Sequence, residues 1–233
     1  MSRKLILILA FIFLAHSAQA QLFSKERLAN LETFDQRFLT WGYFLGFNQY
    51  DFKIEYEGPQ AEDIVIDRVG GFNVGLIGDM RLNEHMNLRL EPGLYFTQRD
   101  IRFPGFVEER DILREVKSTY IHVPLLLKVS TKRLNNFKPF IVGGVSSAWN
   151  LSSNSDNPQD NSGGEFRMES TAQFWEVGFG IDFYLFYFKF TPSIRGVFAM
   201  NNELIPDNDP NSPWTGNISS MGTRGIFINF TFQ

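Results

Sequence analysis

Cysteine is absent from this chain of 233 residues, so no disulfide can hold the fold together. The same absence excludes a lipoprotein, because the lipid of a lipoprotein is attached to a cysteine at the cleavage site. Lys and Arg do not gather into a basic stripe and the net charge is −4, so we expect no nucleic-acid partner. After residue 20, no apolar run approaches the roughly 18 residues of a spanning helix. If the mature protein lies in a membrane, it must cross it as strands.

The N-terminus has the pattern of a secretory signal peptide. Arg3 and Lys4 form a positive region, an apolar run follows at residues 5–14, and Ala18-Gln19-Ala20 matches a cleavage site. The sequence therefore predicts three parts: a signal peptide at 1–20, a periplasmic pre-barrel segment at 21–38, and a barrel at 39–233.

Alternation of apolar and polar residues is the strongest pattern in the rest of the chain. From Phe188 to Arg195, every second side chain is apolar and those between are polar, so a strand here has one oily face and one polar face. The pattern recurs along most of the chain, and its polar face repeatedly carries charge. Phenylalanine is abundant, with 25 residues, which suits a wall with aromatic girdles. These features predict a barrel with lipid outside and a polar interior.

Turn residues divide the alternating pattern into eight candidate strands. They are Thr40–Ile54, Val69–Leu82, Met86–Phe103, Lys117–Thr131, Phe137–Leu151, Phe174–Tyr184, Phe188–Arg195 and Thr223–Gln233. Short connections alternate with long polar ones, and the last strand carries an aromatic residue at its end, Phe232. The predicted fold is all-β: an eight-stranded antiparallel up-and-down transmembrane β-barrel in the outer membrane, with both termini periplasmic.

Charged residues on the polar faces predict a filled interior. We chose hairpin registers in which inward-facing residues of one strand lie opposite inward-facing residues of the next. These registers place Asp182 opposite Lys189, Glu176 opposite Arg195, and Asp79 opposite Arg89. An eight-stranded barrel is just wide enough for side chains to fill it. We expect a nearly neutral, structural salt-bridge network rather than a selective pore, made of Asp79, Arg81, Arg89, Glu91, Lys128, Glu176, Asp182, Lys189 and Arg195.

Catalytic and metal sites are weakly indicated. Of the histidines after the signal peptide, His85 falls in a short turn and His122 points inward, with Ser118 on the same face of its strand. A His–Ser dyad there is the enzymatic alternative, and a hydrogen-bonded interior histidine is the structural one. A loop beginning at Asp207 has the first spacings of a calcium loop but carries Ser212 where glycine is required. We therefore expect no catalytic residue, no cofactor and no metal site.

Several stretches together resemble the PorT (SprT) family of Bacteroidetes outer-membrane barrels. The stretches are Asn30-Leu31 and Phe34-Asp35, Gly42 to Asn48, Asp79 to Glu84, Pro92-Gly93-Leu94, Pro124 to Lys128, Asn135 to Gly144, and Val177 to Tyr184 with Lys189-Phe190. The segment before the first strand and the turn from Asn135 to Gly144 make the resemblance specific. The resemblance implies an accessory of the type IX protein secretion system, linked with gliding motility, and provides no catalytic motif.

The leading hypothesis is a non-enzymatic barrel that works through its rims, with membrane lipid and other secretion-system proteins as partners and no small-molecule substrate. The segment from Leu22 to Phe38 mixes charged and apolar residues, which suits either a docking element or a lid on the barrel mouth. One alternative is a small porin-like or ligand-binding outer-membrane barrel. The other is an outer-membrane enzyme that uses His122.

Overall fold

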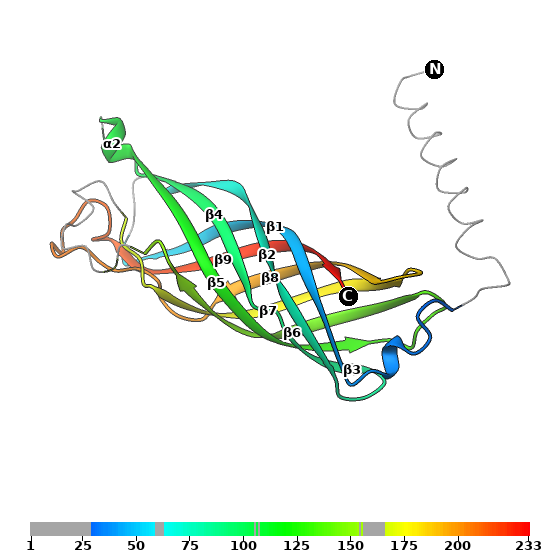
Figure 1. The fold of residues 1–233 in the computed structure, drawn as a ribbon. Coiled ribbons are helices and arrows are strands. Elements are labelled where there is room, and N and C mark those ends of the chain that lie inside the picture. Colours follow the sequence, from blue (N-terminus) through cyan, green and yellow to red (C-terminus); the bar gives the residue numbers. More distant parts are fainter. Residues whose placement is uncertain (1–28, 59–62, 105, 107, 154, 156–165) are drawn as a thin grey trace, which may run out of the picture.

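The computed structural model describes residues 29–233 apart from 59–62, 105, 107, 154 and 156–165. The predicted signal peptide and the first part of the pre-barrel segment lie outside the described residues. Within the described residues, no helix has the length and apolar character needed to cross a membrane. The strands form one antiparallel sheet that curls into an elongated barrel (Figure 1).

The described elements are nine strands, one 3-10 turn and one helical turn. In chain order they are η1 (Phe34–Gln36), β1 (Leu39–Tyr56), β2 (Val65–Arg81), β3 (Met86–Leu90), β4 (Gly93–Arg102), α2 (Glu109–Ile112), β5 (Leu113–Ser130), β6 (Phe137–Asn150), β7 (Thr171–Tyr184), β8 (Lys189–Ala199) and β9 (Ile218–Phe232).

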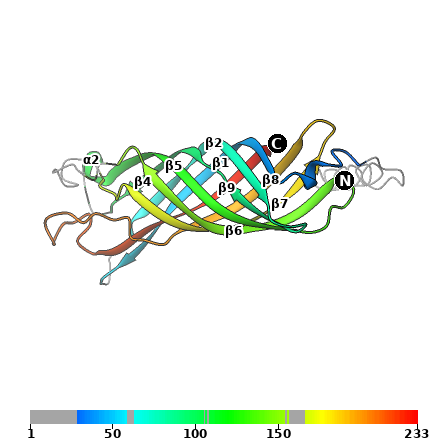
Figure 2. The ribbon, with the colours of Figure 1, turned by 60° about the horizontal axis from the view of Figure 1, so that its bottom comes forward.

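The sheet closes because β1 pairs with both β2 and β9. Strands β3 and β4 both lie between β2 and β5, so they share one position and the barrel has eight positions around its ring. The predicted single strand from Met86 to Phe103 is therefore broken. The break falls at Glu91 and Pro92, because proline has no N–H to donate to a neighbouring strand. The closed, tilted wall is visible from a second side (Figure 2).

An apolar belt surrounds the outer wall next to the end with the short turns, which we call the turn end. On β1 the outward side chains from Leu39 to Phe47 are all exposed and apolar. That length is about the 9–11 residues that a tilted strand needs to cross a bilayer. Neighbouring strands continue the belt with Leu76, Leu125, Ile141, Phe179 and Ile228. Period-2 alternation thus places apolar side chains outside, as the sequence predicts, while the interior holds polar residues together with buried apolar ones such as Phe44 and Leu126.

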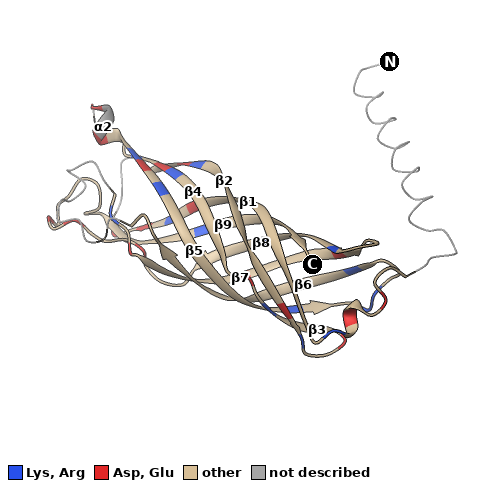
Figure 3. Cartoon of the chain, viewed as in Figure 1, with Lys and Arg blue, Asp and Glu red and all other residues tan. Residues whose placement is uncertain are grey.

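Beyond the belt, toward the end with the long loops (the loop end), the pattern inverts. Outward positions become charged, as at Lys53 and Lys117, while Phe52, Ile101 and Val116 are buried inside. Figure 3 shows charged residues gathered on the strand segments near α2. The barrel therefore has two storeys: one with an apolar exterior, and one with an apolar core and a charged exterior.

Four predicted strands begin several residues too late, including β7, which begins at Thr171 instead of Phe174. The structure begins β2 at Val65 instead of Val69, β5 at Leu113 instead of Lys117, and β9 at Ile218 instead of Thr223. In each case the missing residues lie at the loop end. Polar and charged side chains such as Lys117 and Gln173 lie outward there, so the apolar-outward pattern that predicts the strands does not extend to these residues.

The predicted register of the β7–β8 hairpin is wrong by two residues. Arg195 lies opposite Gly178 instead of Glu176, and Lys189 lies opposite Tyr184 instead of Asp182. The cause is the turn, which spans Leu185–Phe188 and is closed by a 3.0 Å hydrogen bond between the residues at its two ends. In the hairpin of β2 and β3, Asp79 does lie opposite Arg89, as its predicted register requires.

Two adjacent glycines on β6 differ in the space around them. A Cβ on Gly144 would lie 2.2 Å from the backbone oxygen of Leu125, whereas one on Gly143 would have the Glu176 oxygen as its nearest neighbour, at 3.6 Å. We expect Gly144→Ala to lower the free energy of unfolding by about 2 kcal/mol or more, because backbone strands would have to separate. Urea unfolding would measure the loss, with Gly143→Ala as the matched control. Equal stabilities of the two variants would contradict the close approach.

Candidate functional site

A chain of ion pairs runs through the interior of the apolar-belted storey. Arg89 Nε contacts Asp79 at 2.8 Å, and its Nη1 lies 3.5 Å from Glu91. Glu91 in turn contacts Arg195 Nη1 at 2.7 Å, and Arg195 Nε lies 3.5 Å from Glu176. These five side chains are almost fully buried and come from β2, β3, β7, β8 and the β3–β4 break. They cross-link opposite parts of the wall, so the lumen is occupied by paired charge.

A second group of charges lies toward the turn end. The ammonium group of Lys128 is paired with Asp182, whose other oxygen accepts a 2.8 Å hydrogen bond from Thr191. Lys189 is also buried, and its ammonium group lies 4.7 Å from the centre of the Phe34 ring. The predicted pairing of Asp182 with Lys189 in the β7–β8 hairpin is therefore wrong, and Asp182 pairs with Lys128 from β5 instead.

One residue of the predicted network lies apart from it. Arg81 is at the end of β2, and its Nε donates a 3.4 Å hydrogen bond to the backbone oxygen of Asn83 in the following turn. Arg81 is the last residue of β2, so its side chain lies at the rim of the barrel instead of inside it. Arg81 thus belongs to the turn-end mouth.

His122 is fully buried at the loop-side end of the ion-pair chain. Its Nε2 lies 2.7 Å from Ser146 Oγ and 2.9 Å from Glu176 Oε1. The remaining faces of the ring are packed by Tyr95 and Phe174. In a hydrolytic triad, the hydroxyl and the carboxylate contact opposite nitrogens of the imidazole. Here both are at Nε2, so the carboxylate cannot orient the ring for proton abstraction from serine.

The serine expected beside His122 has other partners. Ser118 accepts hydrogen bonds of 3.5 Å from Arg99 Nη2 and from Asn150 Nδ2. Together with the burial of His122, this arrangement favours the structural interpretation of the histidine over the dyad.

The loop end is closed by a polar layer and then an apolar one. Arg99 is fully buried, donates to Thr223 Oγ1 and to the Tyr120 hydroxyl at 2.9 Å each, and stacks 3.9 Å from the centre of the Phe52 ring. Glu203, from the loop before β9, accepts from the amide and the hydroxyl of Thr223 at 2.8 and 2.9 Å. Burial raises the pKa of the Glu203 carboxyl, and the nearby Arg99 opposes that rise.

Above this layer, loop residues complete an apolar cap. Leu204 and Met168 come from different long loops, pair through an isolated bridge, and pack with Phe103, Phe166 and the other core residues of this storey. The loop that carries partial calcium-loop spacing is held by its own side chains. Ser212 Oγ donates to Asp207 at 2.5 Å.

The turn end is closed by the residues just before β1, which form a lid. Phe34 of η1 is 7% exposed and meets the Tyr184 ring edge-on at 6.3 Å. The Tyr184 hydroxyl donates to Asp35 at 2.6 Å, and Asn30 donates from its backbone N–H to Asn136 Oδ1 and from its side-chain amide to the backbone oxygen of Tyr184. Arg133 adds bonds to the backbone oxygens of Asn30 and Leu31. Of the two interpretations of this segment, the described part fits the lid.

The interior also holds Arg99, which is not among the predicted network residues. The period-2 series of Tyr95 and Thr97 on β4 points inward and reaches Arg99 two residues later, so the signal was present. A ladder of amides was also missed. Asn73 donates to Asn229 at 2.8 Å and accepts from Asn48 at 3.4 Å, which joins β1, β2 and β9 across the closing seam.

Comparison with known proteins agrees with this architecture. Residues 19–204 match the model of the family described as outer membrane protein beta-barrel domain. No curated protein matches the sequence. Similar solved structures include OprG from Pseudomonas aeruginosa, with 16% identity over 82% of this chain and 94% of that one and a TM-score of 0.41. Ail from Yersinia pestis is 12% identical over 82% of this chain and 96% of that one, with a TM-score of 0.36. Neisserial surface protein A is 8% identical over 81% of this chain and 95% of that one, with a TM-score of 0.41. The family match covers most of the sequence, and the chain therefore belongs to the outer-membrane protein β-barrel family.

Proposed function

We propose that this protein is a non-conducting, non-enzymatic barrel of the outer membrane that acts through its two ends. The observation that carries the proposal is the closure of both mouths. The Phe34 lid covers one, the Arg99–Glu203 layer and the apolar cap cover the other, and ion pairs fill the space between. In this proposal the lid faces the periplasm and the long loops face outward, which is the usual orientation of such barrels.

We further propose that it serves the type IX protein secretion machinery as an accessory or assembly component. The support is the sequence resemblance to the PorT family, which includes the lid residues Asn30, Leu31, Phe34 and Asp35. In the structure these same residues fix the lid to the β6 and β7 ends of the wall. The lid would thereby present a defined periplasmic surface to other secretion components.

Deletion of the gene in its host tests this role. We expect proteins that carry a C-terminal sorting domain to fail to reach the cell surface, and the full chain supplied in trans to restore their export. A chain with His122→Ala should restore export as well, because the histidine has no catalytic geometry. The measurement is the surface fraction of one such substrate, quantified by protease shaving.

Normal export in the deletion strain would remove the secretion role and leave a general outer-membrane barrel. The second candidate, a small porin, makes a separate prediction. Large, steady conductance of the purified barrel in planar bilayers would contradict the closed lumen, whatever the export result.

A further inference from the structure

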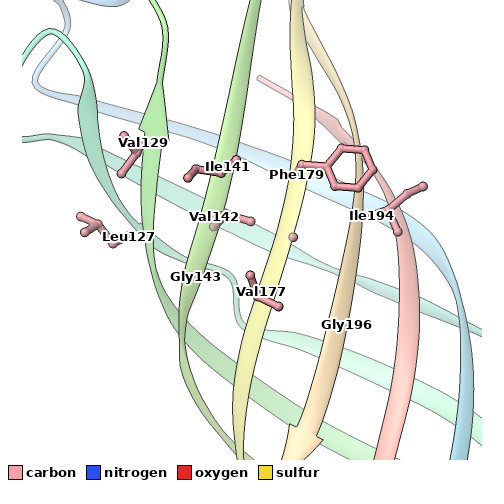
Figure 4. A pocket seen from close by; sticks show the side chains of 10 residues that line it. Leu127, Val129, Ile141, Val142, Gly143, Val177, Phe179, Ile194 and Gly196 are labelled. Atoms are coloured by element: carbon pink, nitrogen blue, oxygen red, sulfur yellow. The ribbon is translucent and has the colours of Figure 1, made fainter.

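A trough crosses the outer wall within the apolar belt. Its floor is the row Gly196, Val177 and Gly143, which are paired neighbours on β8, β7 and β6. We call these three residues the glycine trough. The hollow around them has a volume of about 630 Å³ and is lined by apolar side chains that include Leu127, Phe179 and Ile194 (Figure 4).

The register explains the shape of the trough. The next outward row toward the turn end is Ile194, Phe179 and Ile141, and the next toward the loop end contains Phe198 and Trp175, whose rings stack at 4.3 Å. Bulky side chains therefore form two parallel walls, and the absence of side chains on two of the three floor residues leaves the space between them. The trough is thus a consequence of the sequence at defined register positions.

A cationic site adjoins the trough at the loop-end edge of the belt. A second hollow, of about 200 Å³, also includes Gly196 in its lining and continues to Ile226, Arg224 and Arg68. Both guanidinium groups contact the same oxygen of Asp51, Arg224 at 2.8 Å and Arg68 at 3.0 Å. Two cations share one anion, so the group carries a net charge of +1. The Arg68 and Arg224 side chains are still 53% and 48% exposed.

We propose that the glycine trough and these arginines bind one anionic phosphate-bearing membrane lipid. The headgroup phosphate would sit on Arg68 and Arg224, because guanidinium groups hydrogen-bond phosphate oxygens in a paired geometry. An acyl chain would lie over Gly196 into the trough. The two hollows meet at Gly196, so a single molecule with a charged end and an apolar end fits both.

The position favours lipid over the other occupants. The arginines stand where the outward residues of β9 change from Ile226 and Ile228 to charged, the level at which lipid headgroups meet the wall. In a symmetric pair that buries this surface, a second copy would bring its own Arg68 and Arg224 against these arginines, which is unfavourable. This inference does not depend on the secretion role.

The test uses the full mature chain in a non-ionic detergent, with phosphatidylglycerol or phosphatidylcholine added, and native mass spectrometry to obtain the apparent Kd of each. We expect tighter binding of phosphatidylglycerol. Arg224→Gln and Arg68→Gln should each weaken it about fivefold, the usual contribution of one basic residue near a lipid surface. Asp51→Asn should strengthen it, because the site then has both charges uncompensated.

The trough is tested by filling it. Gly196→Leu should weaken the binding of both lipids, and so should Gly143→Leu. The second variant is needed because the new Cβ at residue 196 would lie 3.1 Å from the Phe198 ring, and this crowding could prevent Gly196→Leu from folding. Lys117→Gln, an exposed cation elsewhere on the outer wall, is the charge control. Val74→Leu, on the lipid-facing side of β2, is the control for added bulk.

Three outcomes would overturn the proposal. Arginine variants that bind phosphatidylglycerol like the native chain would remove the headgroup site. Glycine variants that bind lipid like Val74→Leu would remove the acyl site. A dimer that disappears in Gly143→Leu would make a second copy the occupant of the trough.

Discussion

Arg195→Met should lower the free energy of unfolding by about 3–5 kcal/mol, the usual effect of removing one partner from a buried ion pair. Arg195 lies between two carboxylates, Glu91 at 2.7 Å and Glu176 at 3.5 Å, and all three side chains are nearly inaccessible. Methionine reproduces the side chain only as far as the position of Nε, so the loss would combine unpaired charge with the contacts of the missing guanidinium group. Urea titration of the barrel in vesicles, followed by tryptophan fluorescence, measures it.

The control is an ion pair of the same type outside the lumen. Lys117 and Glu115 are 2.8 Å apart, but their side chains are 67% and 50% exposed. Lys117→Met should therefore leave the free energy of unfolding nearly unchanged, because water screens an exposed pair. The double variant Glu91→Gln with Arg195→Met should be more stable than Arg195→Met alone, since one uncompensated carboxylate is removed. A loss below 1 kcal/mol for Arg195→Met would mean that the network contributes little to stability.

Phe34→Ala should release the lid without unfolding the barrel. The ring is 7% exposed, touches Tyr184 and lies under the Lys189 ammonium group, and removal of a buried phenyl ring typically costs about 3–5 kcal/mol. This loss should open the lid, whose remaining contacts with the wall are hydrogen bonds such as that from Tyr184 to Asp35. Trypsin cleavage after Arg37, which follows η1 directly, should then accelerate more than tenfold.

A nearby phenylalanine provides the comparison. Phe38 lies four residues later and is 68% exposed, so Phe38→Ala should leave the cleavage rate after Arg37 nearly unchanged. The urea midpoint of the barrel should be the same for both variants. If Phe34→Ala and Phe38→Ala are cleaved at equal rates, the lid is not held by the buried ring.

Much of the site could be predicted because inward and outward positions follow from a period of two. Asp79, Arg89 and Glu91 were assigned to the interior, and all three are buried there in contact with one another. The partners were harder to predict. The pairing of Lys128 with Asp182 joins β5 to β7, and that of Arg195 with Glu91 joins β8 to the β3–β4 break. A hairpin register pairs residues only on adjacent strands, so it cannot predict contacts between strands on different sides of the lumen.

The class of fold, the alternation of short and long connections and the apolar face of each strand within the belt can all be inferred from the order of the residues. These are local properties, since each follows from neighbouring residues on one strand. The shift of β7 against β8, the lid over the mouth and the apolar core at the loop end emerge only in the folded chain. The shift follows from the geometry of one local turn, Leu185–Phe188, which an alternating pattern does not specify. The lid and the loop-end core instead join residues far apart in the chain, as Phe34 meets Tyr184 and Met168 meets Leu204.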